Sequence, residues 1–328
     1  MIKIQLLLVS QPSIGDNQQY YKHLIIRYLD NNFKALNIKA YLQLTRPANI
    51  ITAIADILAG ISIASFSFSI INISPLNITF LCISTIGLYG GGIVFNDIFD
   101  LELDKIERPE RVIPSGIISK NNAIIFGVLL LALGIFSAMA NSLISSLIAL
   151  LVAICALVYD KFGKHHSFFG PINMGLCRGG NLILGMSIIE NAIPQWWWLG
   201  FLPVCYIAAI TMISRGEVHG GNKNTLYFAA FLYIFVSSCQ LLIAFQLNNL
   251  LITTAFVALH IFLIFKPLIT AITNPIGPNI GKAVKAGVLS LIVMDAAWVS
   301  VSGNIIVTIA VLCLLPISIK LAKVFAVT

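Results

Sequence analysis

The chain has 328 residues, of which 58% are hydrophobic and only 10% are charged. Soluble domains carry about 25% charged residues, so this composition excludes a soluble globular protein and indicates an integral membrane protein. The formal net charge is +7, which we attribute to basic loops beside the bilayer and not to nucleic-acid binding.

Residues 1–46 are the only long polar stretch, and we expect them to form a cytoplasmic N-terminal segment. Between about Tyr20 and Leu44, apolar and basic residues mix at roughly helical spacing, which suits a helix lying on the membrane surface. A simple solvated arm fits this stretch nearly as well. Residues 47–328 indicate a single transmembrane domain, because no polar domain interrupts their apolar runs.

Ten apolar runs follow, and each reaches or nearly reaches the ~20 residues that a helix needs to cross a bilayer. The runs are continuous and do not alternate, which favours helices over barrel strands. The sequence therefore predicts an all-α membrane protein, a bundle of nine to ten transmembrane helices. The predicted spans are residues 48–71, 78–98, 120–140, 143–159, 171–189, 195–214, 225–246, 249–270, 280–301 and 303–325.

Lys and Arg occur in alternate loops only. The loops around residues 72–77, 140–143, 189–195, 247–249 and 302–304 contain neither residue type. Cytoplasmic loops carry the excess of Lys and Arg, so we expect the basic loops and the N-terminus in the cytoplasm, at the plasma membrane of a bacterium. Lys320 and Lys323 favour a tenth crossing that returns to the same side.

The second span ends in an acidic stretch, GGGIVFNDIFDLELDKIERPERVIPSG, at residues 90–116. Offsets of three and four residues place four side chains on one helical face: Asn96, Asp97, Asp100 and Asp104. Carboxylates so close repel one another unless a cation lies among them, and Mg²⁺ suits one or two carboxylates plus substrate phosphates. A solvated helix end explains the charge poorly, because a membrane span precedes it. We therefore predict a metal–diphosphate site here.

The acidic stretch and the residues after it resemble the first signature of the UbiA superfamily of intramembrane prenyltransferases. The resemblance lies in N-D-x-x-D-x-x-x-D from Asn96, followed by R-P-x-R-x-x-P-S-G from Arg108 to Gly116. Thr45-Arg46-Pro47 and the loop from Tyr159 to Lys164 resemble further family features, the latter one residue longer than usual. The resemblance covers residues 45 to about 300. It implies a bundle of nine spans that uses Mg²⁺ and a polyprenyl diphosphate.

A second signature of that superfamily, D-x-x-x-D after the sixth span, is altered in this chain. Only Glu217 matches one of the two aspartates, and Ile213 stands at the other. This loop and the sequence GPxNMGxCRGGNLxLG at residues 170–185 are similar to an EboC-like branch of the superfamily. One carboxylate is a poor Mg²⁺ site, so we hypothesise that Arg215 and Lys223 replace the second metal, with Glu217 orienting Arg215.

The resemblance implies an enzyme that transfers a prenyl chain from a polyprenyl diphosphate to an unidentified acceptor, expected to be aromatic. The metal ligands are then Asp97, Asp100 and Asp104, supported by Asn96, and the catalytic residues are Asp97, Asp100, Arg215 and Glu217. Candidates for diphosphate contact are Arg108, Arg111, Lys161, Lys164 and Lys223, although loop cations also set topology. The alternative is a membrane protein that binds or carries isoprenoid diphosphates without transfer.

Charged side chains inside spans mark functional or paired residues. Arg178 and Asn181 share one face of the fifth span and are candidate substrate-binding residues. Asp56 lies at comparable depth in the first span and could pair with Arg178. A buried ion pair that only fixes helix register is an equally weighted reading. Asp295, deeper in the ninth span, has no partner that the sequence identifies.

Overall fold

A computed structural model describes residues 38–70, 73–164, 166, 168–218 and 220–325. The expected interfacial helix lies mostly outside these residues, since its described part begins only at Ile38. The chain separates into two units, Met1–Tyr41 and Leu42–Thr328. The second unit contains every helix from α3 onward.

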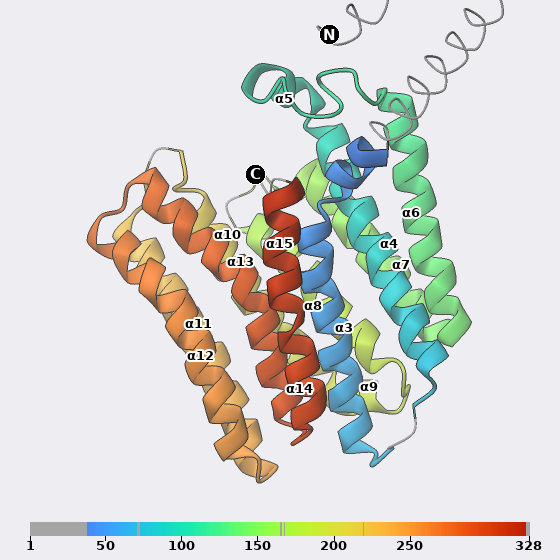
Figure 1. Ribbon diagram of the computed structural model, residues 1–328, viewed down its shortest axis with the longest axis vertical. Helices are drawn as coiled ribbons and strands as arrows, with labels where there is room; N and C mark the ends of the chain where they lie inside the picture. Colours follow the sequence, from blue (N-terminus) through green and yellow to red (C-terminus); the bar gives the residue numbers. More distant parts are fainter. Residues whose placement is uncertain (1–37, 71–72, 165, 167, 219, 326–328) are drawn as a thin grey trace, which may run out of the picture. The chain divides into compact units, whose positions relative to one another are not determined.

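The long helices run side by side along most of their length (Figure 1). In chain order they are α3 (Pro47–Ser67), α4 (Pro75–Phe99), α5 (Leu101–Glu107), α6 (Lys120–Asn141), α7 (Leu143–Val158), the π-helical turn η1 (Tyr159–Gly163), α8 (Phe169–Met186), α9 (Ala192–Trp196), the 3₁₀ turn η2 (Trp197–Gly200), α10 (Phe201–Ser214), α11 (Lys223–Gln246), α12 (Leu250–Thr273), α13 (Gly277–Ser300), α14 (Ile305–Leu312) and α15 (Leu314–Phe325).

Nine helical segments within the described residues are long and apolar enough to cross a membrane. They include the predicted last span, observed as Ile305–Phe325, and a sixth span that joins α9, η2 and α10. Helix α8 packs in the bundle in addition to these nine segments. It is more polar than they are, because it carries Asn173, Arg178 and Asn181. The predicted all-α bundle of nine to ten helices is confirmed.

Helices α3 and α8 contribute to both apolar cores of the bundle. One core joins them to α10, α11, α12 and α13, and the other joins them to α4, α6 and α7. The pair crosses at very short range, since a Cβ added at Gly60 would overlap the Leu182 carbonyl and one at Gly185 would overlap the Ile57 carbonyl. Small residues allow such close helix crossings in membranes.

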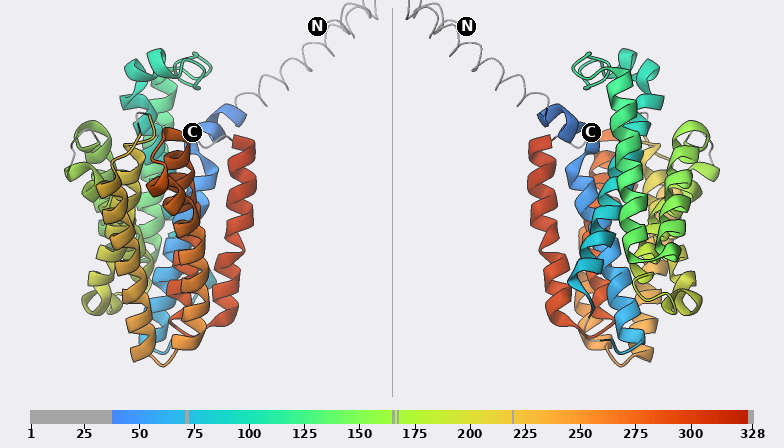
Figure 2. Two further views of the ribbon diagram at one scale, coloured as in Figure 1. Left: turned by 90° about the vertical axis from the view of Figure 1, so that its left-hand side faces the viewer. Right: turned by 90° about the vertical axis from the view of Figure 1, so that its right-hand side faces the viewer.

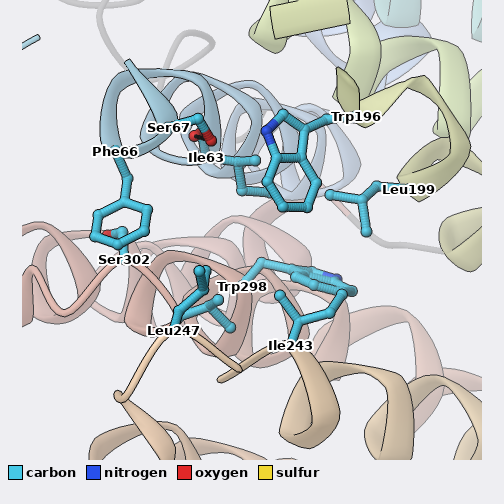
Figure 3. A pocket seen from close by; sticks show the side chains of 10 residues that line it. Ile63, Phe66, Ser67, Trp196, Leu199, Ile243, Leu247, Trp298 and Ser302 are labelled. Atoms are coloured by element: carbon cyan, nitrogen blue, oxygen red, sulfur yellow. Dashed lines mark hydrogen bonds between the residues drawn. The ribbon is translucent and has the colours of Figure 1, made fainter. Parts of the chain in front are cut away.

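The basic loops gather at one end of the bundle. This end holds residues 42–46, α5, η1, the loop after Ser214 and the end of α15, and Figures 1 and 2 show the arrangement. The opposite end holds the loops without Lys or Arg. It also holds a small pocket between Trp196 and Trp298, lined further by Ile63, Phe66 and Ile243 (Figure 3).

Candidate functional site

The acidic stretch sits at the basic end, where α4 gives way to α5. Asp100 ends one helix and precedes the next, with φ −86° and ψ 0°. The backbone hydrogen bonds from Asp100 N to Asn96 O and from Asp104 N to Asp100 O carry the helical spacing across this junction. The predicted common face therefore persists through the break. Asp97 and Asp104 are buried, with 7% and 3% of their surface exposed.

Basic side chains from three separate segments meet these carboxylates. Arg46, in the left-handed conformation just before α3, donates from Nη2 to Asp97 Oδ1 over 2.6 Å. Arg111 lies 2.7 Å from Asp104 Oδ2 and 3.6 Å from Asp97 Oδ1. Lys164, after η1, contacts the Asp100 carboxylate. Arg111 and Lys164 thus lie beside the acidic stretch, and their contact with an anionic substrate stays a prediction; Arg46 was not among the predicted site residues.

Asp160 is a further carboxylate of the site that the sequence interpretation missed. It is buried on η1, and its Oδ1 accepts a hydrogen bond of 2.8 Å from Asn96 Nδ2. The only signal for it was its place beside Tyr159 in the Tyr159–Lys164 loop. We name the set Arg46, Asp97, Asp100, Asp104, Arg111, Asp160 and Lys164 the acidic mouth.

Lys161 and Lys223 lie apart from these contacts. The Lys161 ammonium stands 5.0 Å from the centre of the Phe162 ring, on the exposed side of η1. Lys223 is exposed and opens α11. The contact of both lysines with a diphosphate therefore stays a prediction. For Lys161 it requires the side chain to move away from the Phe162 ring.

The altered second loop runs between α10 and α11. Arg215 donates from Nη2 to the His166 carbonyl over 3.0 Å and lines an open pocket with Gly220, Asn222 and Thr225. Partial burial raises the pKa of Glu217 above its usual range, and the nearby Arg108 guanidinium partly offsets the rise.

Arg178 and Asn181 lie deep in the bundle. Arg178 Nε stands 2.7 Å from Asp56 Oδ2, so the predicted pairing of these two residues is confirmed. Asn181 donates to the Ala53 carbonyl and to Asp56, and accepts from Thr85 Oγ1. Asn181 thereby ties α8 to α3 and α4, and its hydrogen-bonding groups are engaged within the protein.

The described residues contain no group of three or more His, Cys, Asp or Glu side chains close enough to hold a metal by themselves. In proteins, Mg²⁺ commonly binds through one or two carboxylates and takes its other ligands from substrate phosphates and water. Asp97 and Asp100 offer such carboxylates, and basic groups beside them offer phosphate contacts.

A family comparison decides what kind of protein carries this site. The model of the UbiA prenyltransferase family matches residues 56–271. The chain belongs to the UbiA prenyltransferase family. The match contains α4, the acidic mouth except Arg46, and the second loop.

Individual relatives agree with this membership. The chain is 28% identical over 180 residues to digeranylgeranylglyceryl phosphate synthase of Saccharolobus solfataricus, covering 55% of this chain and 62% of the relative. It thus spans less than two thirds of that relative's length. A UbiA homologue from Aeropyrum pernix superimposes with a TM-score of 0.62 at 16% identity, over 76% of this chain and 96% of the homologue.

A second solved UbiA homologue, from Archaeoglobus fulgidus, is bound to DMAPP and Mg²⁺. It superimposes with a TM-score of 0.57 at 18% identity, over 76% of this chain and 98% of the homologue. Identities this low establish the fold alone. The protein is therefore an integral, multi-pass member of the UbiA family.

Proposed function

We propose that the protein is a Mg²⁺-dependent intramembrane prenyltransferase that takes its prenyl chain from a polyprenyl diphosphate. The observation that carries this proposal is the acidic mouth, where four carboxylates and three basic groups converge at the polar end of an apolar bundle. Such a site fits a ligand with an anionic head and an apolar tail. The mouth faces the cytoplasm in this proposal, because the basic loops lie at that end.

Asp97 and Asp100 would hold Mg²⁺, which neutralises the diphosphate and eases its departure. Three basic groups would bind the phosphate oxygens, because contacts with carboxylates hold them at the mouth: Arg46, Arg111 and Lys164. Asp104 positions Arg111, and Asn96 positions Asp160. The apolar helices beneath the mouth exclude water from the allylic carbon.

The second loop, between α10 and α11, would bind the outer phosphate group of the diphosphate. Arg215 lines a pocket at the start of α11, where backbone N–H groups of a helix N-terminus favour an anion. Lys223 lies at the same helix start. Glu217 keeps its predicted role of orienting Arg215, and the Arg108 guanidinium acts on the Glu217 carboxylate electrostatically.

The acceptor is proposed to be a hydroxyl group of a polar molecule at the membrane. The relatives named above include a synthase of digeranylgeranylglyceryl phosphate, whose name points to a glyceryl phosphate acceptor. The expected aromatic acceptor gains no support from these relatives. They are archaeal, so a bacterial source gains none either.

Product formation tests the proposal. Protein in nanodiscs is incubated with radiolabelled geranylgeranyl diphosphate, Mg²⁺ and either a glyceryl phosphate lipid or an aromatic acid as acceptor. We expect diphosphate release together with a labelled ether product from the lipid. Tight donor binding without release, over a broad panel of acceptors, would instead establish the carrier alternative.

A further inference from the structure

Each of the two carboxylates proposed to hold Mg²⁺ forms an ion pair with a cation of the chain. Arg46 Nη2 lies 2.6 Å from Asp97 Oδ1, and Lys164 Nζ contacts Asp100 Oδ1. The four side chains are between 10% and 20% exposed, so solvent screens these pairs less than it screens pairs at the surface. The two cations therefore act strongly on any ion that the carboxylates bind.

The ion pairs use one oxygen of each carboxylate. Among the described residues, no hydrogen bond reaches Oδ2 of Asp97 or Oδ2 of Asp100. Arg111 approaches Asp97 at Oδ1 as well, but only to 3.6 Å, and its closer partner is Asp104. Asp97 and Asp100 can thus bind a second cation through Oδ2 while Arg46 and Lys164 stay on Oδ1.

Arg46 and Lys164 oppose a metal ion that binds to these carboxylates alone. A cation on one oxygen of a carboxylate lies close to a cation on the other, and like charges repel strongly where burial lowers the screening. A diphosphate reverses the effect, because its oxygens accept charge-assisted hydrogen bonds from the guanidinium and the ammonium groups. The same two side chains thus disfavour the metal alone and favour the metal together with a diphosphate.

The backbone holds Lys164 at this place. Its N–H group donates to the Tyr159 carbonyl over 3.0 Å and closes the π-helical turn η1. Four residues earlier, Asp160 accepts a hydrogen bond from Asn96. Asn96 itself lies four residues before Asp100, so two contacts in register join η1 to the end of α4. Lys164 is therefore a fixed part of the acidic mouth and not a loosely placed loop cation.

We propose that Arg46 and Lys164 couple the metal to the diphosphate: they hinder the binding of a divalent metal ion alone and stabilise its binding together with the diphosphate group. This inference rests on the proposed function, because it concerns regulation of the same site. Through this coupling, the acidic mouth selects the magnesium complex of the diphosphate over the free metal ion.

Two titrations of the same variants, in nanodiscs of phosphatidylcholine, test the coupling. The first measures binding of Mn²⁺ alone, a stand-in for Mg²⁺ that electron paramagnetic resonance detects. The second measures binding of radiolabelled inorganic pyrophosphate at saturating Mn²⁺. The variants are Lys164→Gln and Arg46→Gln. Lys105→Gln is the control, since it removes the same charge from an exposed pair with Glu102 on α5, outside the acidic mouth.

We expect Lys164→Gln to bind Mn²⁺ at least about tenfold more tightly than the wild type, and pyrophosphate at least about tenfold more weakly. Arg46→Gln should change both affinities in the same directions. Lys105→Gln should stay within about twofold of the wild type, because solvent and salt screen an exposed charge. Loss of a contact that only stabilised the fold would not tighten Mn²⁺ binding.

Unchanged or weaker Mn²⁺ binding in Lys164→Gln and Arg46→Gln would overturn the inference, and so would unchanged pyrophosphate binding. Unfolding temperatures confirm that the variants are folded, and either variant alone decides the test if the other is not. Binding of labelled geranylgeranyl diphosphate to the wild type with Mn²⁺ is measured in parallel. Its absence would refute the proposed function, whereas donor binding with equal Mn²⁺ affinities in all variants would refute the coupling alone.

Discussion

The carboxylates of the acidic mouth differ in the basic groups that they contact, and we infer their roles from these contacts. Asp97 contacts Arg46 and stands near Arg111, so it lies between two groups suited to phosphate. Asp104 lies on α5 and holds Arg111 over 2.7 Å. We therefore assign Asp104 to positioning Arg111, whereas the sequence counted it among the metal ligands.

This assignment predicts the behaviour of the variant Asp104→Asn. In Asp104→Asn the charge that holds Arg111 is lost, but Asp97 and Asp100 remain for Mg²⁺. We expect donor binding to weaken on the order of tenfold, corresponding to about 1.4 kcal/mol for a charge-assisted contact, with its Mg²⁺ requirement unchanged. Titration of labelled donor at several Mg²⁺ concentrations measures both quantities. Loss of the Mg²⁺ requirement in this variant would make Asp104 a metal ligand after all.

Substitutions at Arg215 and Glu217 provide a pair of contrasting variants. Arg215→Ala should weaken donor binding more than Glu217→Gln, because the guanidinium offers two phosphate contacts and the carboxylate offers none. Arg215 is exposed, so water screens its contribution, and we expect about 1 kcal/mol for its loss. The same donor titration gives the answer. A larger effect of Glu217→Gln would favour a second metal held by Glu217.

At the scale of helices, the crossing of α3 and α8 holds the Asp56–Arg178 pair in register. Gly185→Ala would push a methyl group against the Ile57 carbonyl and separate the two helices. We expect a loss of about 1–3 kcal/mol in unfolding free energy. Gly92→Ala is the control, since its methyl group would meet the Ala156 methyl at 3.4 Å, an ordinary contact. Reversible unfolding in mixed detergent micelles compares the two, and equal stabilities would refute close packing at this crossing.

The spans and the acidic face followed from the sequence because both depend on local spacing. Hydropathy over about 20 residues identifies a span, and offsets of three and four identify a helical face. Asp160 escaped notice because its partner Asn96 is 64 residues away. Contacts between distant segments depend on how the helices pack against one another, and residue spacing along the chain does not predict that packing.

At the scale of the whole protein, the alternation of loops with and without Lys and Arg determines the proposed orientation. A single cysteine introduced at Glu190, in an otherwise cysteine-free background, should react with a membrane-impermeant maleimide added outside intact cells. A cysteine at Lys120 should react only after the cells are opened. The reverse pattern would invert the protein in the membrane and place the acidic mouth outside.

The central claim is that Asp97 holds Mg²⁺ against a prenyl diphosphate at the mouth of the bundle, and donor binding tests it most directly. Labelled geranylgeranyl diphosphate is titrated against wild-type protein and Asp97→Asn in nanodiscs, with Mg²⁺ and with a chelator. We predict tight binding by the wild type only when Mg²⁺ is present, and weak binding by Asp97→Asn in both conditions, with unfolding temperatures confirming that the variant is folded. Equal donor affinity of the two proteins, with or without chelator, would contradict the account.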